Sequence, residues 1–466
     1  MNRRRFLKLG AGASAGLALS SLGLERLSPT IWREQVSVEP NLSHWARTQL
    51  VPEPTVSEDL VVDTLVVGAG LTGLSSALHL RRALPNESVA VLDARQAGNG
   101  GSGRSGGFLC SWPCTNDWMW VTSSPEHHKR GYELTAQAIQ ALREIARDAR
   151  PDAELDLAGV LQLLSRESLD WGHEYLAAAK KLGIPVELWS RDKVRETVGV
   201  DYAGGLYDPN GGLCQPRHLT LAVKAAAQRA GALVFDDSPV VHVEQGDIVR
   251  ATLTNGRLVR ARRLVLGTGA WTTQLGFFRD GLFPVSNYMA VTPRLSSDQR
   301  AAAGLRHRMP FNDDRANLVY MGLTRDDRFT IGGGYARLGF NNGTDTNRHA
   351  ERIASVLRRE LGDFFPSLET MPFAHAWGGA VGLTLDQAPS VGCTGSHGNV
   401  FYGVGYSGHG MVMGFLAGRV IAEMAAGLGG DWEGMPFVNK SMPYVPHEPF
   451  RSTGGNAYIA ALDLLG

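Results

Sequence analysis

The sequence predicts a Rossmann-like α/β domain of the two-dinucleotide type, joined to an α+β domain built on an antiparallel sheet. Two units of strand, glycine turn and helix, one near residue 70 and one near residue 408, indicate the first domain. Alternating strand-like runs between residues 284 and 334 indicate the second. Because a glycine turn before a helix lets the backbone approach a ligand, both ends of the chain are expected to meet at one site.

The first glycine turn has the parts of a dinucleotide-binding fingerprint. An apolar run at 65–67 is followed by G-x-G-x-x-G at Gly68, Gly70 and Gly73, and helical spacing continues over 74–84. Gly68 allows the tight turn, Gly70 lets the backbone approach a pyrophosphate, and Gly73 lets the helix lie against the strand. The free amides at the start of the helix would then face the phosphates.

An acidic residue completes this fingerprint. A short strand at 89–92 ends in Asp93, twenty residues after Gly73, where a carboxylate can accept both ribose hydroxyls. A carboxylate favours a free ribose over a 2′-phosphate, which predicts FAD or NAD and not NADP. The flanking cofactor-binding candidates are Leu71, Thr72, Ala94 and Arg95.

Composition limits the classes of partner. The chain has 466 residues, 43% of them hydrophobic, and its 46 basic residues balance 46 acidic ones. A neutral total gives no electrostatic reason to expect nucleic acid. Four cysteines are too few and too scattered for a disulfide framework. Cys110 and Cys114 have a C-x3-C spacing, but no second pair accompanies them, so buried thiols are favoured over a zinc site and no metal is expected.

The first residues resemble an export signal. Arg3, Arg4 and Arg5 precede Phe-Leu-Lys and a weakly apolar, glycine-rich stretch at 9–19. This pattern predicts a twin-arginine signal over 1–25 and export of the folded protein to the periplasm by the twin-arginine machinery. No A-x-A cleavage site is evident near residue 25, so retention as an N-terminal membrane anchor stays open. Residues 26–60 are interpreted as a linker that wraps onto the domain. Docking of 43–45 is one interpretation of this segment, and a simply buried tryptophan is the favoured alternative.

A glycine-rich loop at 97–107 follows Asp93, where backbone could approach a planar or anionic ligand closely. The candidates in this loop are Ser102, Arg104, Ser105, Gly106 and Gly107. An aromatic patch, Trp112, Trp118, Met119 and Trp120, lies just beyond it and is assigned equally to core or to substrate wall.

Further periodicity fills the middle of the chain. Helices are expected at 134–147, 169–182, 219–230 and 350–361, and short strands at 233–235, 240–243, 250–253, 258–259 and 264–266. The last of these strands leads into a glycine turn that resembles the return of a two-dinucleotide fold to its cofactor. The candidates here are Val241, Gly267, Gly269 and Trp271.

The C-terminal glycine turn repeats the arrangement of the first. A strand at 400–402 enters a glycine-rich turn, and helical spacing runs over 411–424, so free amides could stabilise negative charge there. The candidates are Gly408, His409, Gly410 and Met411. The dinucleotide-binding domain is accordingly placed at 61–150, 204–275 and 375–430, the substrate domain at 151–203 and 276–374, and a C-terminal tail at 431–466.

With these blocks located, residues 43–430 resemble the D-amino-acid oxidase-like superfamily of FAD-dependent oxidoreductases, which includes glycine oxidase and monomeric sarcosine oxidase. They are most similar to its γ-glutamylputrescine oxidase branch. The matching blocks are 66–74, 101–107, 209–216 and 405–410. The resemblance implies that Gly68, Gly70, Gly73 and Asp93 bind the ADP half of FAD. It also implies that Ser102, Arg104–Gly107 and Gly408–Met411 hold the isoalloxazine, with the amides after Gly408 facing its N1–C2=O edge.

Two departures from the family pattern concern the flavin. Sarcosine oxidases carry a lysine beside flavin N5 that activates oxygen, where this chain offers Thr330. Some relatives bind flavin covalently through a cysteine in the region that is 376–384 here, which contains none, so noncovalent FAD is expected. His409 is interpreted as ordering the flavin loop and not as a catalytic base.

The resemblance implies hydride transfer from an amine or amino acid to flavin N5, hydrolysis of the imine to an aldehyde or keto acid, and reduction of O2 to H2O2. Catalytic residues are not identified. The pocket candidates are Trp112, Tyr288, Tyr320, Trp377 and His409. A dehydrogenase that passes electrons to a membrane quinone and a non-catalytic flavin-binding assembly factor are the alternatives. No arginine stands out as a carboxylate clamp, which favours amines over amino acids.

Overall fold

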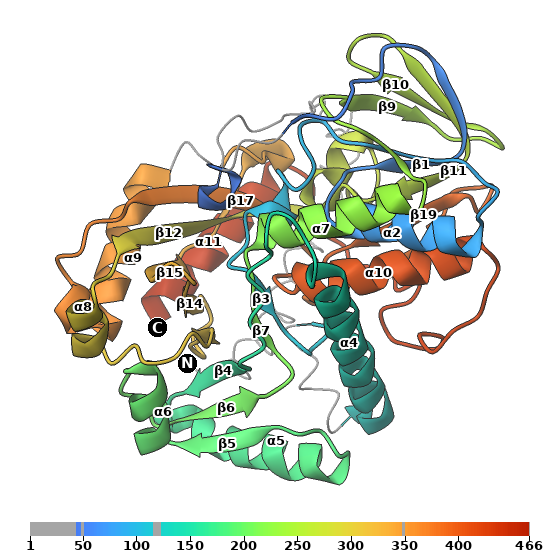
Figure 1. The fold of residues 1–466 in the computed structure, drawn as a ribbon. Coiled ribbons are helices and arrows are strands. Elements are labelled where there is room, and N and C mark those ends of the chain that lie inside the picture. Colours follow the sequence, from blue (N-terminus) through green and yellow to red (C-terminus); the bar gives the residue numbers. More distant parts are fainter. Residues whose placement is uncertain (1–42, 48–50, 115–122, 347–349, 466) are drawn as a thin grey trace.

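Two β-sheets organise the chain (Figure 1). The computed structural model describes residues 43–47, 51–114, 123–346 and 350–465. The predicted twin-arginine signal and the aromatic residues Trp118, Met119 and Trp120 lie outside the described residues. The two predicted domains are both present, each with a sheet of its own.

The first sheet contains eight strands in the order β18-β19-β11-β1-β2-β8, with β10 and β9 added beside β11. The strands from β19 to β8 run parallel, as expected for a Rossmann-like sheet. Their bounds are β1 Leu60–Val67, β2 Val89–Leu92, β8 Leu233–Phe235, β9 Val240–Glu244, β10 Val249–Leu253, β11 Leu258–Leu266, β18 Ser390–Thr394 and β19 Val400–Val404.

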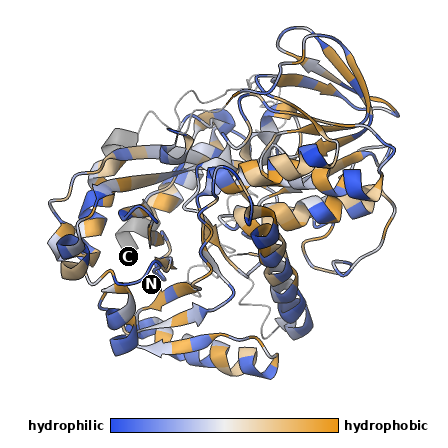
Figure 2. Cartoon of the chain, viewed as in Figure 1, coloured by the Kyte–Doolittle hydropathy of each residue, from blue (hydrophilic) through white to orange (hydrophobic). Residues whose placement is uncertain are grey.

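Helices cover this sheet and carry most of its apolar contacts. Their bounds are α2 Leu71–Ala83, α4 Pro125–Ala146, α7 Pro216–Arg229 and α10 Gly410–Ala425. α2 packs between α7 and α10 (Figure 1). Figure 2 shows that α10 is hydrophobic along much of its length and that α4 is largely hydrophilic, in keeping with α10 being almost entirely buried at its N-terminal end. One core of this domain lies between the sheet and the four helices α2, α4, α7 and α10, and a second core lies on the opposite face of the sheet with β9 and β10.

The second sheet contains nine strands in the order β16-β12-β15-β14-β13-β4-β6-β5, with β17 paired to β12. All of its pairs are antiparallel except β13 with β4. The strand bounds are β4 Val160–Leu164, β5 Glu187–Ser190, β6 Gly204–Asp208, β12 Phe283–Arg294, β13 Phe311–Asn312, β14 Val319–Leu323, β15 Arg328–Gly333, β16 Arg337–Leu338 and β17 His375–Leu383. The associated helices are α5 Leu169–Lys181, α6 Arg191–Val198, α8 Ser297–Ala302, α9 Ala350–Phe364 and α11 Phe450–Leu465.

Several boundaries differ from those expected. β6 and β17 belong to the second sheet, because β6 pairs with β4 and β5 and β17 pairs with β12, although 204–275 and 375–430 were assigned to the dinucleotide-binding domain. The strands expected at 258–259 and 264–266 form one strand, β11. The predicted C-terminal tail includes α11, which packs against β16.

The contact between α2 and α10 depends on small residues. A Cβ at Gly418 of α10 would lie 2.4 Å from the Cβ of Ser75, so only glycine permits this close approach. The Ser75 hydroxyl donates to the carbonyl oxygen of Phe415 at 2.6 Å. Next to it, the His79 ring packs edge-on against Phe415, with ring centroids 5.6 Å apart. The two helices consequently start side by side at the same edge of the sheet.

None of the described helices combines the length and the apolar character that crossing a bilayer requires.

The helix pair predicts a pH dependence of stability. Burial lowers the pKa of His79 from 6.5 to about 4, so the unfolded chain takes up this proton more readily than the folded protein. The contribution of neutral His79 to the free energy of unfolding is therefore complete above pH 6.5 and is lost as the pH falls toward 4. The free energy of unfolding falls by at most about 1.4 kcal/mol per pH unit in this range. The melting temperature should differ less between pH 7 and pH 5 for His79→Gln than for the wild type.

His242, an exposed histidine on β9, provides the matched control. His242→Gln should keep the wild-type difference between the two pH values. An unchanged difference in His79→Gln would contradict the assignment to this helix contact.

Candidate functional site

Three glycine backbones cross where β1 turns into α2. A Cβ at Gly73 would lie 1.9 Å from the carbonyl oxygen of Gly68, and one at Gly68 would lie 2.5 Å from that of Gly267. Gly68 also has a φ of +100°, which side chains disfavour. Gly267, which follows β11 and was a predicted cofactor-binding residue, is thus in direct contact with the fingerprint glycines.

Polar side chains fix this turn. The two carboxylate oxygens of Asp93 accept hydrogen bonds from the backbone N–H groups of Ala69, at 2.7 Å, and Arg95, at 2.9 Å. The Ser102 hydroxyl accepts from the Leu71 N–H at 2.9 Å. Because each carboxylate oxygen has two lone pairs, Asp93 retains capacity to accept from ligand hydroxyls. The residues predicted to bind the ADP half therefore lie together.

The glycine loop after β2 contacts both sheets. It includes the 3-10 turn η3 (Gly101–Gly103), and Arg104 after this turn is 5% exposed. The Arg104 guanidinium donates to the carbonyl oxygens of Asn99, at 2.8 Å, and Gly378, at 3.0 Å. In return, the Trp377 indole N–H donates to the carbonyl oxygen of Arg104 at 2.9 Å. These bonds join the loop to β17 of the second sheet.

The end of the loop meets the block at 209–216. β3 (Phe108–Leu109) pairs with β7 (Gly212–Leu213), and Gly107 takes a φ of +76° just before β3. A Cβ at Gly107 would lie 2.1 Å from the carbonyl oxygen of Cys214. This pairing brings the glycine-containing blocks 101–107 and 209–216, which are far apart in the sequence, to the same site.

The C-terminal glycine turn lies beside α2. Gly408 has a φ of +102°, His409 is the N-cap of α10, and Met411 in the first turn is buried. The Tyr406 hydroxyl is 2.8 Å from that of Thr72 on α2. The N-termini of α2 and α10 thus lie close together, as the two predicted glycine turns require.

Two other glycines at the site, Gly100 and Gly101, are not demanded by the protein's own packing, whereas Gly70 lies close to the side chain of Ser102. Gly70, Gly100 and Gly101 have ordinary φ values. The atoms nearest to an added Cβ are a side-chain oxygen at 3.0 Å for Gly70, and atoms at 3.7 Å for Gly100 and Gly101. Glycine at positions 100 and 101 is explained if a ligand approaches the backbone closely, so the site passes a test of fit for a dinucleotide such as FAD.

Two predicted contacts lie at the margins of this site. Trp271, in η6 (Gly269–Leu275), has its ring 3.7 Å from the position of a Cβ on Gly100, so it flanks the glycine loop. Val241 on β9 is 38% exposed. The chain before β9 contacts Asp93 through its backbone: the Ser238 N–H donates to the carbonyl oxygen of Asp93 at 2.7 Å, and the Asp93 N–H donates to that of Phe235 at 2.9 Å.

A narrow cavity, partly open to solvent, lies between the glycine loop and the second sheet. Its buried lining comes from both domains, whereas its more exposed lining is charged. The buried residues are Trp45, Gly106, Leu213, Cys214, Gln215, Leu323, Thr324 and Thr330, and the charged residues are Glu154, Asp156, Arg308 and Arg325.

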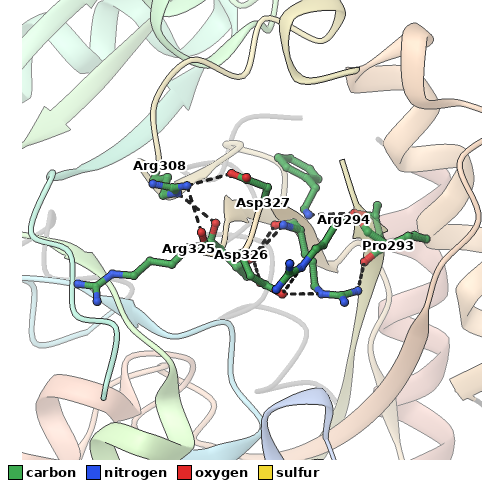
Figure 3. A network of polar contacts seen from close by, with 10 residues as sticks. Pro293, Arg294, Arg308, Arg325, Asp326 and Asp327 are labelled. Atoms are coloured by element: carbon green, nitrogen blue, oxygen red, sulfur yellow. Dashed lines mark hydrogen bonds and ion pairs between the residues drawn. The ribbon is translucent and has the colours of Figure 1, made fainter. Parts of the chain in front are cut away.

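The arginines of the cavity already have acidic partners, and Figure 3 shows the pair of Arg308 with Asp327. Arg308 pairs with Asp327 at 2.9 Å, and Arg325 pairs with Asp152 at 2.9 Å. Burial raises the pKa of Glu154, which also has a φ of +50°, an uncommon conformation for a residue with a side chain. The charged lining therefore consists of two acidic residues, Glu154 and Asp156, and two arginines that pair with aspartates. Sequence patterns gave no signal for these residues, because they come from three unrelated segments.

The predicted pocket aromatics do not all lie together. Tyr320 and Trp377 share a cluster with Trp45, Met289 and Val291. Tyr288 is instead packed in the core beneath the second sheet, because neighbouring residues of a strand point to opposite faces and Met289 faces the site. Trp112 packs against the cluster around α5, although its sequence position suggested the glycine loop.

Residues 63–424 match a family model described as "FAD dependent oxidoreductase". Among curated relatives, the probable oxidoreductase OrdL of Haemophilus influenzae is 28% identical, over 82% of this chain and 87% of that protein. The γ-glutamylputrescine oxidoreductase of Escherichia coli is also 28% identical, over 89% of this chain and 96% of that protein. Among solved structures, glycine oxidase from Geobacillus kaustophilus superimposes with a TM-score of 0.69 at 19% identity. The superposition covers 82% of this chain and 99% of the glycine oxidase chain.

The glycine geometry separates folding from cofactor binding. Gly70→Ala introduces a Cβ that meets only the Ser102 hydroxyl, so the thermal transition should survive while the dissociation constant of FAD rises by at least about tenfold, or ~1.4 kcal/mol. Gly73→Ala places a Cβ against a backbone oxygen, so the cooperative transition itself should be lost. Melting curves and FAD titration, followed by flavin fluorescence, measure the two effects.

Gly246→Ala, in the half-buried turn between β9 and β10, is the control for strain away from the site: its Cβ would lie 3.3 Å from the carbonyl oxygen of Ile248, so stability should fall slightly while the dissociation constant of FAD stays unchanged. Equal loss of stability in Gly70→Ala and Gly73→Ala would show that Gly70 is required by the fold and not by the cofactor.

Proposed function

The chain belongs to the family of FAD-dependent oxidoreductases, and on this premise we propose that it oxidises the carbon–nitrogen bond of a small amine or amino acid. Membership confirms the superfamily inferred from the glycine blocks. FAD, when bound, supplies a hydride acceptor at its N5 atom. The observation that supports the proposal best is the cavity between the glycine loop and the second sheet, because both domains contribute to its lining.

The substrate loses a hydride from carbon and a proton from nitrogen, which leaves an imine that water hydrolyses to a carbonyl compound and an amine or ammonia. An amine that binds as its cation first gives a proton to solvent, and the neutral amine then needs no strong catalytic base. The protein's contribution is to position the substrate and exclude water. Consistent with this role, the buried part of the cavity is formed by Trp45, Gly106, Leu323 and other residues that carry no charge.

The charged part of the cavity favours an amine over an amino acid. Glu154 and Asp156 line it, while Arg308 and Arg325 are engaged with aspartates. A cationic substrate is therefore attracted, and a substrate carboxylate finds no unengaged arginine among the described lining residues. The relationship to γ-glutamylputrescine oxidoreductase supports an amine substrate in the same way.

Noncovalent FAD is part of the proposal. No cysteine occurs in β17, and the cavity cysteine, Cys214, is fully buried. Burial raises the pKa of the Cys214 thiol well above its ordinary value, so it stays protonated and is a poor nucleophile toward a flavin.

The electron acceptor is proposed to be O2, with H2O2 as product, and a membrane quinone is the second candidate. Thr330 favours the quinone. Its hydroxyl, 2% exposed, donates to the carbonyl oxygen of Gly322 at 3.0 Å, so this position supplies no positive charge to stabilise reduced oxygen.

Anaerobic titration tests both parts of the proposal. Amines should bleach the flavin absorbance of the purified protein, and admission of air should restore it with release of H2O2. Restoration only by a quinone analogue would identify a dehydrogenase. Failure of every amine and amino acid to bleach the flavin would contradict the proposed reaction and favour a non-catalytic flavin protein.

A lysine introduced at residue 330 should accelerate reoxidation by O2. A cation beside the bound flavin stabilises negative charge on reduced oxygen, so Thr330→Lys is expected to raise the second-order rate constant by about tenfold or more. Stopped-flow mixing of the reduced protein with oxygenated buffer measures this constant. Thr330→Met, which is long but uncharged, should leave it close to the wild-type value. Equal rates in the two variants would show that charge at this position does not limit reaction with oxygen.

We also propose that the protein is exported by the twin-arginine route. Support comes from the sequence of the first residues alone, which lie outside the described residues. Replacing Arg3 and Arg4 by lysine should leave FAD-loaded protein in the cytoplasm, measured by fractionation of the cells. Unchanged export of this variant would contradict the assignment.

A further inference from the structure

We propose that residues 43–47, which precede the dinucleotide fold, form a fixed wall of the substrate cavity and that Trp45 limits the size of the amine the cavity accepts. This inference rests on the proposed function. Residues 44–47 form the 3-10 turn η2 (His44–Arg47), which lies against β17 and the start of α7, far from the next described strand, β1 (Figure 1). This segment is called the N-terminal wall below.

The N-terminal wall is held to the glycine loop by its side chains. The Ser43 hydroxyl donates to the carbonyl oxygen of Gly103 at 2.7 Å, and the Trp45 indole N–H donates to that of Ser105 at 2.9 Å. Both acceptors belong to the loop that was predicted to contact the cofactor. The wall is therefore joined to the glycine loop by direct hydrogen bonds.

The backbone of the N-terminal wall is held by side chains from the start of α7. Gln215 donates to the carbonyl oxygen of Trp45 at 3.2 Å, and Arg217 donates to that of Ala46 at 3.0 Å. Arg217 is 2% exposed, and its second hydrogen-bonding partner is the amide oxygen of Gln96. A guanidinium buried against neutral acceptors carries a desolvation cost, so its use here indicates that the position of the wall matters.

Trp45 lies where the two domains meet. It is 7% exposed and packs edge-on against Trp377 of β17, with ring centroids 5.9 Å apart and an interplanar angle of 81°. The indole lines the cavity together with Gly106 of the glycine loop and Thr330 of β15. A side chain that is anchored at its polar end and borders a cavity with its ring has the geometry of a size filter.

The preceding residue adds no charge to this wall. The His44 ring stacks on Trp377 at 6.2 Å, and burial lowers the pKa of His44 to about 4, so its imidazole is neutral at physiological pH. A protonated amine that approaches the cavity therefore meets Glu154 and Asp156 and no opposing cation from His44. Simple anchoring of a linker would account for the burial of Trp45 but not for its exposure to the cavity.

Variants of Trp45 test the wall through selectivity. Trp45→Ala should raise the ratio of kcat/KM for a bulky amine to that for a small amine by about tenfold or more, because a few methylenes of pocket space are worth such a factor. Trp45→Phe should shift the ratio in the same direction by less, and it provides the test if the alanine variant fails to fold. Trp432→Ala is the matched control, because Trp432 is 6% exposed but packs in the core of the first domain.

Iodide quenching of flavin fluorescence supplies a readout that does not depend on turnover. Opening the wall should raise the quenching constant of Trp45→Ala or Trp45→Phe above that of wild type and Trp432→Ala. If quenching increases but no amine reduces the flavin, the result supports the role of the wall and contradicts the proposed function. Reduction by amines with unchanged selectivity and unchanged quenching would overturn the wall and keep the function.

Discussion

The absence of side chains where three backbone segments cross is the constraint on which the site depends. Gly68, Gly73 and Gly267 lie so close that a Cβ on any one of them would collide with a backbone atom of another. This crossing holds the end of β11 against the turn into α2. Gly418 then brings α10 against α2, so the amino ends of both helices open at the same edge of the sheet.

The second sheet is joined to this edge by buried polar groups. Between the glycine loop and β17, the Arg104 guanidinium donates to the carbonyl oxygen of Gly378 and the Trp377 indole donates to that of Arg104. Arg217 bonds the N-terminal wall to the start of α7. Both guanidinium groups are bonded to neutral carbonyl oxygens. Because an unsatisfied buried donor is costly, these bonds specify a single arrangement of the domains around the cavity.

The glycine turns could be predicted because their chemistry is local. G-x-G-x-x-G, a strand before it and an acid after the next strand are all read within about thirty residues. The lining of the cavity could not be predicted in this way. Tyr288 and Met289 are adjacent in the sequence and lie on opposite faces of β12. Which of the two faces the site is set by the pairing of β12 with β15 and β17, and the sequence pattern does not reveal that pairing. Glu154, Asp156 and Arg308 meet only because β4 and β13 pair in parallel.

The position of Trp45 bears on where the functional unit begins. The family match spans 63–424, and a polypeptide trimmed to those limits would retain the glycine crossing and both helix starts. It would lack the indole that closes one side of the cavity, and also α11, whose Arg451 donates to the carbonyl oxygen of Arg279 at 2.8 Å. Such a shortened protein would keep the glycine turns and lose the proposed wall, so substrate profiling needs the residues on both flanks of the matched region.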